Sequence, residues 1–209
     1  MKLLFENWRE YIKEEKESFK RISASPWNNA AAKQEWGEEI EAAYKKGDEY
    51  IDQRWPGLSK KLIEENYPFL LNAEDFAAAI AAAPIKNLSF SEMKNIDNHA
   101  QVYDIIEMYE KNKTSEEVHD EIYKFFTGMQ TDPGIKGKKY PKETSYQKWV
   151  DYFAEKDIID KPPIVLELLN GRLAHVGGQT RQAGALTNQK IIPYVVLSPT
   201  QGEQNETPT

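Results

Sequence analysis

The chain contains no cysteine and only three histidines among its 209 residues. Without thiols it can form neither a disulfide nor a thiolate metal site, which fits the reducing cytoplasm where we expect it to act. No apolar run approaches the roughly 20 residues that a membrane-spanning helix needs. Acidic residues begin at Glu6, so we also expect no signal peptide.

Several motifs that would name a reaction are missing as well. No glycine is followed by the Lys-Ser or Lys-Thr pair of a P-loop. No His-x-x-x-His pair or carboxylate cluster has the spacing of metal ligands, so we predict no protein-built metal site. We find no internal repeat. Without these motifs, the sequence indicates a globular protein, and any activity must be inferred from a less specific pattern of residues.

Charge is distributed unevenly along the chain. The net charge is -7 and 40% of the residues are hydrophobic, enough for one sizeable core. Residues 1–131 are acidic, with a net charge of -8, whereas residues 132–209 have a net charge of +1. The basic residues of the second part cluster between Lys136 and Lys148. A uniformly acidic chain would not suggest a general DNA coat, because binding to phosphates needs local positive charge, but here the charge is not uniform.

The first part of the chain has the 3.6-residue periodicity of amphipathic helices. Asn72 is a predicted N-cap, and the pairs Ser89/Glu92 and Thr114/Glu117 are predicted capping boxes. We therefore expect an all-helical region over residues 1–131, followed by one more helix. The predicted helices cover about 2–22, 29–46, 57–66, 73–83, 90–112, 115–127 and 144–156, with a short helix ending near Trp55.

After residue 131 the pattern changes from helix to strand. The turn at Thr131–Gly134 and the lysine-rich loop after it predict a boundary between two units. Residues 164–169 and 172–176 are predicted strands joined by a hairpin turn at Asn170-Gly171. A helix over 179–187 and a strand over 191–197 follow, and we expect the tail from residue 201 to be disordered. The fold class is therefore α+β, with a small α/β unit over 132–200.

The stretch Gly177-Gly178-Gln179-Thr180-Arg181 is the best candidate for a functional site. Two glycines between a strand and a helix let a ligand approach the backbone, and the amides at the helix start carry partial positive charge. Thr180 adds a hydroxyl and Arg181 a bidentate donor suited to phosphate or carboxylate. The alternative is an ordinary tight connection between a strand and a helix.

The order of these elements resembles the core of the ParB/sulfiredoxin superfamily over about 49 residues, roughly a quarter of the chain. The resemblance runs through a helix, an extended segment after a proline, a hairpin, a glycine turn with an arginine, an alanine-containing helix and a final Ile-Pro strand. The matching segments are 152–159, 163–167, 170–176, 177–185 and 192–197. The opening residues, Met1–Arg9, resemble the start of small proteins of tailed bacteriophages, which would place the chain in a host cytoplasm.

This resemblance implies a Gly-x-x-Arg turn that binds nucleotide phosphates, with Gly178 and Arg181 in those places. Members of the superfamily include CTP-binding partition proteins, sulfinic acid reductases that use ATP, a free-serine kinase and nucleases. Partition proteins carry an acid inside the turn, where this chain has Gln179-Thr180. Sulfiredoxins need a cysteine, which is absent here, so sulfinic acid reduction is not expected.

The remaining polar residues have two interpretations each. His175 is either an ordinary strand residue or a catalytic general base beside the turn. His99 and His119 are expected at the surface, although His99 with Asp97 and Asp104 could instead face the site. The basic residues are either a solvated loop or a surface that attracts a polyphosphate or a nucleic acid; the candidates for nucleic-acid contact are Lys136, Lys138, Lys139 and Lys142.

The sequence thus predicts a protein that binds ATP or another nucleoside triphosphate on residues 177–181, with Mg²⁺ held mostly by the phosphates. If the protein is an enzyme, phosphoryl transfer or hydrolysis of the triphosphate fits this turn best. The alternatives are a non-enzymatic module that binds DNA or a protein, and a ParB-like nuclease. The sequence does not fix the oligomeric state.

Overall fold

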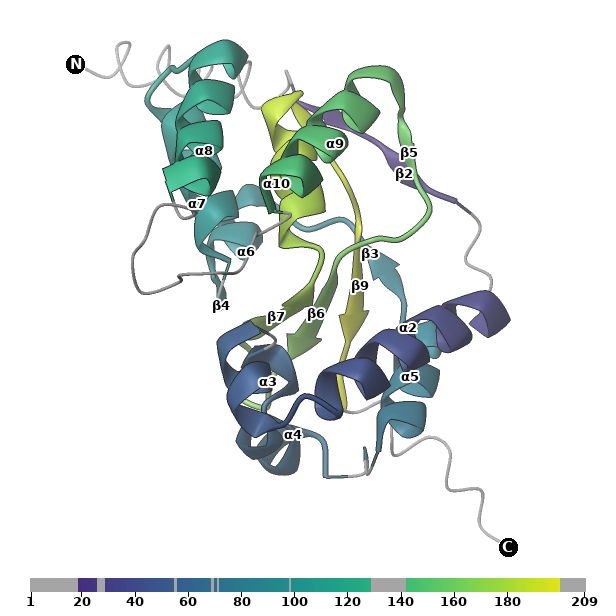
Figure 1. The fold of residues 1–209 in the computed structure, drawn as a ribbon. Helices are drawn as coiled ribbons and strands as arrows, with labels where there is room; N and C mark the ends of the chain where they lie inside the picture. Colours follow the sequence, from purple (N-terminus) through teal and green to yellow (C-terminus); the bar gives the residue numbers. More distant parts are fainter. Residues whose placement is uncertain are drawn as a thin grey trace, which may run out of the picture.

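The computed structural model describes residues 19–25, 29–54, 56–68, 70, 72–97, 99–128 and 142–199. Helices and one mixed sheet give the α+β fold that the sequence predicts (Figure 1). The sheet has five strands in the order β3 (Ile85–Lys86), β9 (Tyr194–Leu197), β6 (Ile164–Glu167), β7 (Leu173–Gly177) and β4 (Ile96–Asp97). β6 is parallel to β9 and antiparallel to β7; β3 is antiparallel to β9, and β4 is parallel to β7.

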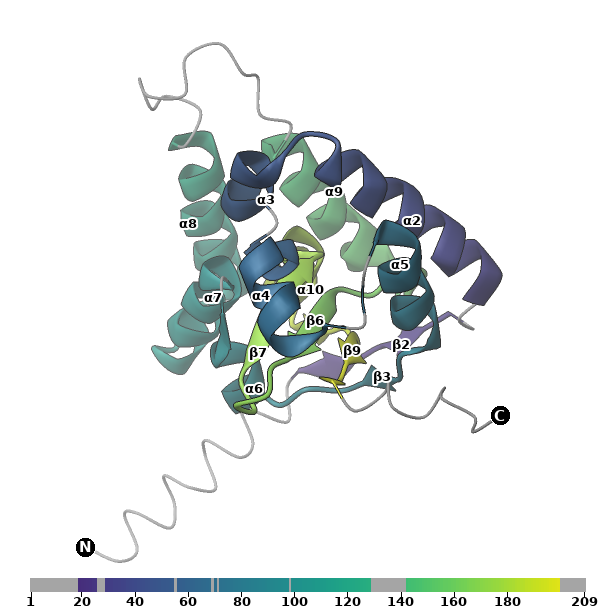
Figure 2. The ribbon, with the colours of Figure 1, turned by 90° about the horizontal axis from the view of Figure 1, so that it is seen from below.

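The central strands are buried on both faces because helices cover each side. Successive side chains of a strand point to opposite faces, so Ile164 and Leu166 enter one core and Val165 the other. Figures 1 and 2 show the first group of helices on one side of the sheet. This group consists of α2 (Asn29–Tyr44), α3 (Asp48–Arg54), the 3-10 turn η1 (Pro56–Leu58), α4 (Lys60–Asn66) and α5 (Ala73–Ala82).

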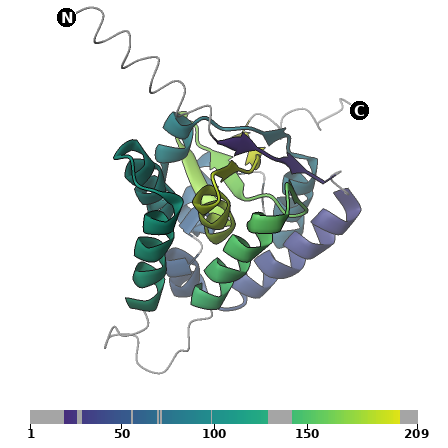
Figure 3. The ribbon, with the colours of Figure 1, turned by 90° about the horizontal axis from the view of Figure 1, so that it is seen from above.

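The second face is covered by helices from both halves of the chain. They are α6 (Phe90–Lys94), α7 (Ala100–Glu110), α8 (Ser115–Gly128), α9 (Lys142–Glu155) and α10 (Gln179–Thr187). In Figure 3, α10, drawn in olive, lies near the middle of the molecule between α9 and the pair α7 and α8. Every residue of α10 from Arg181 to Thr187 is buried, so this helix forms the centre of the second core.

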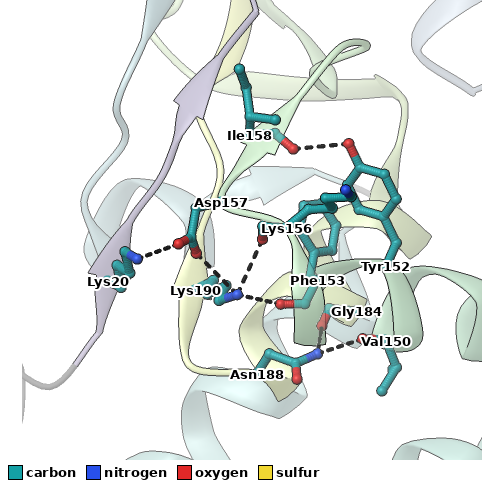
Figure 4. Close-up of polar contacts among 10 residues, drawn as sticks. All are labelled: Lys20, Val150, Tyr152, Phe153, Lys156, Asp157, Ile158, Gly184, Asn188 and Lys190. Atoms are coloured by element: carbon teal, nitrogen blue, oxygen red, sulfur yellow. Dashed lines mark hydrogen bonds and ion pairs between the residues drawn. The ribbon is translucent and has the colours of Figure 1, made fainter.

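Two short parallel strand pairs join the start of the described chain to its end. β1 (Lys20–Arg21) pairs with β8 (Lys190–Ile191), and β2 (Ser23–Ala24) pairs with β5 (Ile158–Ile159). Figure 4 shows that Lys190 binds the last turn of α9, with its ammonium 3.1 Å from the Lys156 carbonyl and 3.0 Å from Asp157. A cation at a helix C-terminus is favourable because the helix dipole leaves negative charge there.

The predicted capping residues are confirmed. Asn72 accepts hydrogen bonds from the amides of Glu74 and Asp75, each at 2.9 Å. Ser89 and Glu92 form a reciprocal capping box. Thr114 and Glu117 do the same, with backbone-to-side-chain distances of 2.8 and 3.3 Å. The short polar side chains therefore set the starts of α5, α6 and α8 as the sequence predicts.

The prediction of one helix over 90–112 is wrong, because β4 interrupts it between α6 and α7. Ile96 is buried and pairs in register with Leu173, so pairing with the sheet outweighs local helix propensity. The first part of the chain is consequently mostly but not wholly helical. It supplies both edge strands of the sheet, β3 and β4, which pair with strands from the second part.

Other predictions differ in detail or lie outside the described residues. Lys20–Arg21 is a strand rather than the end of a helix, and Pro193 separates β8 from β9. The Asn170-Gly171 hairpin is confirmed, with Gly171 at a φ of +78° and its amide bonded to the Leu168 carbonyl at 2.8 Å. The helix before residue 19, the boundary at residue 131 and the tail from residue 201 lie outside the described residues. Among the described helices, none has both the length and the apolar character for crossing a membrane.

The packing of α10 on α9 predicts an unusual response to a helix-favouring substitution. A Cβ at Gly184 would lie 2.7 Å from the Trp149 Cβ and 2.8 Å from its carbonyl carbon. Gly184→Ala should therefore destabilise the protein by about 1–3 kcal/mol from overpacking, even though alanine is the better helix former by about 1 kcal/mol. Gly37→Ala on α2 is the matched control, because its Cβ would meet only the Ala77 Cβ at 3.4 Å. Urea unfolding of both variants measures the difference; equal stabilities would contradict this packing.

Candidate functional site

The glycine turn lies where β7 ends and α10 begins. Gly178 is the N-cap of α10 and adopts a left-handed conformation with a φ of +95°. The first intrahelical bonds are made by Arg181 and Gln182, whose amides donate to the Gly178 carbonyl at 3.0 and 3.1 Å. The amides of Gln179 and Thr180 precede these bonds and point out of the helix start. This is the geometry in which a helix N-terminus holds an anion.

Glycine at position 178 meets two requirements at once. Its positive φ is strained for other residues, and a Cβ there would lie 2.7 Å from the Pro163 Cα. The chain before β6 therefore passes directly against the start of α10. This close approach fixes the turn in place and brings Lys161, two residues before Pro163, beside it.

Arg181 does not extend into solvent from the turn. It is 9% exposed, and its Nη1 donates to the Lys161 carbonyl. Its guanidinium carbon lies 5.7 Å from the ring centre of Trp36 and 5.8 Å from that of Trp149. The Lys161 ammonium lies 4.2 Å from the ring centre of Trp36 and forms an ion pair with Glu39 at 2.5 Å. Arg181 thus supports the turn from inside and adds positive charge beneath it.

Gln179 connects the start of α10 to the start of α7. With its side-chain amide assigned so that the oxygen faces the donors, that oxygen lies 3.2 and 3.1 Å from the amides of Ala100 and Gln101, and the nitrogen lies 2.9 Å from the Gln101 Oε1. The N-cap residue of α7, His99, makes no capping bond with its own side chain. Gln179 therefore caps α7 from another helix, and the two helix N-termini meet. No local sequence pattern predicts this contact, because Gln179 is 79 positions from Ala100 and 78 from Gln101.

Two buried histidines lie beside this junction. The rings of His99 and His175 have centroids 4.7 Å apart, and the His99 Nε2 is 3.0 Å from the Tyr194 hydroxyl. His99 is 2% exposed and His175 is 8% exposed. The prediction that His99 lies at the surface is therefore wrong, whereas the alternative that it faces the site region fits its contact with His175. The polar neighbours Asp97 and Asn98 concealed its burial in the sequence.

Both histidines are neutral at neutral pH. Burial lowers the pKa of His175 to about 3, and the charge of Arg181 acts in the same direction, while a hydrogen bond with the Gly177 backbone opposes it. Burial also lowers the pKa of His99 well below its usual value, with a further effect of His175. Burial raises the pKa of the Tyr194 hydroxyl. A residue so enclosed is poorly placed to act as a general base on a ligand at the surface.

Three buried polar atoms in this layer have no hydrogen-bond partner among the described residues: the His99 Nδ1, the His175 Nε2 and the Gln182 Oε1. The Gln182 amide nitrogen contacts the Met93 sulfur at 3.5 Å. Buried polar atoms without partners are rare because each costs the desolvation free energy of that group. The layer beneath the two helix starts is therefore polar but not internally satisfied.

The other predicted site residues lie apart from this junction. His119, expected to be solvated, is half-buried on α8 and bonds to Gln147 at 3.0 Å. The side chains of Lys136, Lys138, Lys139 and Lys142 lie outside the described part of the chain. Lys148, on α9, is exposed. The structure brings together residues 177–181, His175 and His99.

A separate cleft of about 590 Å³ opens at the hairpin end of the sheet. Its lining contains side chains of both charges, including Lys86, Lys94, Asp97, Glu167 and Arg172. Arg172 is ion-paired with Asp97, and the Glu167 carboxylate accepts a 2.5 Å hydrogen bond from Ser198. β7 begins at this end and reaches the glycine turn at its other end, so the cleft is not part of the junction of α7 and α10.

Comparison with known proteins assigns no family. No family model, curated protein or solved structure matches the chain. Among the described residues, no group of three or more His, Asp or Glu side chains is arranged to hold a metal ion. A functional assignment therefore depends on the geometry of the junction itself.

The buried histidines predict a loss of stability in mild acid. Their pKa values are depressed in the folded state, so the unfolded chain binds protons first as the pH falls below about 6.5. The full stability should be present above that pH. Between about pH 6.5 and pH 3, the unfolding equilibrium constant should rise by up to about tenfold per pH unit for each histidine as the pH falls. Urea unfolding as a function of pH measures this slope. An equal slope for wild type and His175→Gln would contradict the burial of that ring.

Proposed function

We propose that this protein binds a nucleoside triphosphate, with the phosphates on the amides of Gln179 and Thr180. The observation that carries the proposal is the start of α10, where these amides precede the first intrahelical bond of a helix capped by a left-handed glycine. Residues 177–181 include no acid, and the guanidinium of Arg181 adds positive charge beside them. A phosphate group is the ligand that these amides and this guanidinium favour.

The order of elements supports the resemblance of this region to the ParB/sulfiredoxin superfamily. α9, β5, the β6–β7 hairpin, the glycine turn, α10 and β9 follow one another in the order that the resemblance implies. In that superfamily the corresponding turn binds nucleotide phosphates. The resemblance therefore favours a nucleotide over a simple inorganic anion as the ligand.

The arginine has a different role in this proposal from that of an exposed clamp. Because Arg181 is enclosed by Trp36, Trp149 and the Lys161 carbonyl, we assign it to positioning the turn and to supplying positive charge from below. The enclosed His175 gives no support to catalysis, so the proposal is binding. Phosphoryl transfer or hydrolysis with Mg²⁺ held by the phosphates remains a hypothesis. DNA binding through the basic residues from Lys136 to Lys142, and a nuclease, also remain hypotheses.

Thr180 offers a test that separates binding from folding. Thr180→Glu places a carboxylate in the first turn of α10, which favours the helix by about 0.3–1 kcal/mol but repels a phosphate at the same amides. The free variant should melt at or slightly above the wild-type temperature, while the stabilisation by nucleotide should be lost. In wild type, a ligand at 100 times its Kd should add about 2.7 kcal/mol. Thermal shifts with ATP, CTP and GTP, with and without Mg²⁺, measure both effects.

Thr180→Gln is the matched control, since it has the size of glutamate without the charge. It should keep the nucleotide-induced shift. If no nucleotide stabilises wild type, or if Thr180→Glu responds as wild type does, the proposal is wrong. Salt-sensitive DNA binding with no response to nucleotide would favour the module that binds DNA.

A further inference from the structure

The cleft at the hairpin end of the sheet lies where two neighbouring parallel strands end. β6 and β9 run in the same direction, with Leu166 opposite Leu197. Glu167, the last residue of β6, lines the cleft, and so does Val196 near the end of β9. Ligands of open sheets bind beyond the carboxyl ends of parallel strands. The cleft has a volume of about 590 Å³, which is typical of pockets that hold a small organic ligand.

The floor of the cleft is apolar. Leu88, Ile96 and Val196 line it, and each belongs to the second core and is at most 5% exposed. The half-buried Leu173 extends this surface toward the hairpin. An apolar group of a ligand gains free energy on such a floor, because the contact removes both surfaces from water.

Most charged groups around the cleft already have partners within the protein. Asp97 is ion-paired with Arg172, and Lys94 is ion-paired with Glu110 at 2.8 Å. The Glu92 carboxylate closes the capping box at the start of α6. These charges are compensated by the protein itself, so a ligand gains less by pairing with them.

Two charged groups of the lining, Lys86 and Glu167, have no ion-pair partner among the described residues. The Glu167 Oε2 accepts a 2.5 Å hydrogen bond from Ser198, whereas its Oε1 bonds to no described residue. This carboxylate is half-buried, so it has lost part of its hydration and is stabilised by a ligand that brings a cation. Lys86 is exposed on the edge strand β3 and can pair with an anionic group.

The positions of these two charges set the length of the ligand. β9 lies between β3, which carries Lys86, and β6, which carries Glu167 (Figure 1). Neighbouring strands are about 4.8 Å apart, so the two backbones lie at least about 10 Å apart. The ammonium and carboxylate of a single amino acid are too close together to reach both residues. A tripeptide with free termini spans about 10 Å, since an extended chain advances about 3.4 Å per residue.

We propose that this cleft binds a short peptide with free termini, with its ammonium on Glu167, its carboxylate on Lys86 and a central apolar side chain on the floor. Three basic and three acidic side chains line the cleft, and this balance favours a zwitterion over a polyanion. The cleft lies at the end of β7 remote from residues 177–181, so this inference does not rest on the proposed function.

Titration of the intact ¹⁵N-labelled chain with the tripeptide Ala-Leu-Ala at pH 7 tests the proposal. The largest amide shifts should occur at Asn95, Glu167 and Leu173, and the amides of Gln179 and Thr180 should not shift. N-acetyl-Ala-Leu-Ala lacks the ammonium, and Ala-Leu-Ala amide lacks the carboxylate. Each should bind wild type about tenfold or more weakly, because each loses one charge-assisted hydrogen bond.

Two variants assign the two ends of the peptide. Glu167→Gln should bind Ala-Leu-Ala about tenfold more weakly and should no longer discriminate against the acetylated peptide. Lys86→Gln should lose discrimination against the amidated peptide in the same way. Lys94→Gln is the matched control, because Lys94 lines the cleft but is paired with Glu110, and it should bind as wild type does. Thermal unfolding checks that each variant is folded.

Three outcomes would overturn the proposal: no shifts in wild type at millimolar Ala-Leu-Ala, equal affinity for the three peptides, or shifts confined to residues 177–181. The two sites are tested separately. Thr180→Glu should bind Ala-Leu-Ala as wild type does, and Glu167→Gln should keep the wild-type response to nucleotide. Failure of the peptide site therefore leaves the proposed function standing, and the reverse also holds.

Discussion

The close packing of α10 against the chain around it is the constraint on which the rest of the structure depends. Its backbone passes Pro163 at one end and Trp149 in the middle, and glycine is needed at both contacts. At its end, the Tyr109 hydroxyl lies 3.1 Å from the carbonyls of both Leu186 and Thr187, and the Leu186 carbonyl also accepts from the Gln189 amide at 2.8 Å. These contacts restrain the position of the helix at its start, its middle and its end. Its N-terminus is therefore preorganised, which reduces the entropic cost of binding there.

This rigidity explains why the arginine of the turn is an internal residue. In the space beside α10, the guanidinium lies between two tryptophan rings and holds the segment before β6 through the Lys161 carbonyl. Cations near aromatic faces are favourable, and a buried guanidinium needs such neighbours to offset its desolvation. The positive charge remains near the helix start, and under the proposed function the direct contacts with a phosphate would be made by the backbone amides. Specificity for one base or sugar would then come from groups beyond residues 177–181.

The sequence predicted those parts of the fold that depend on local chemistry. Asn72, Ser89 and Thr114 mark helix starts because a short polar side chain can bond only to nearby amides. The glycine turn and α10 were placed correctly because a glycine pair between strand and helix patterns has few other structures. The same local reasoning failed at Ile96, where pairing with Leu173 from the far end of the chain determines the structure.

The sequence predicted where the glycine turn of residues 177–181 lies between a strand and a helix, but not what surrounds it. The capping of α7 by Gln179 and the burial of His99 arise from contacts across about 80 positions. A polar residue after Asp97 and before a helix resembles a surface residue when only neighbours in sequence are considered. Only the packing of α7 against α10 brings it beneath the turn. The electrostatic character of the site, two helix starts above two neutral imidazoles, is therefore a property of the tertiary structure.

The central claim is that the amides at the start of α10 hold the phosphates of a nucleotide. The most direct measurement is a ¹H–¹⁵N correlation spectrum of the labelled protein during titration with ATP. The account predicts the largest shifts at the amides of Gly178, Gln179 and Thr180, with smaller ones at Ala100 and Gln101. Shifts confined to the cleft around Lys86 and Arg172, or no shifts at millimolar ATP, would contradict it.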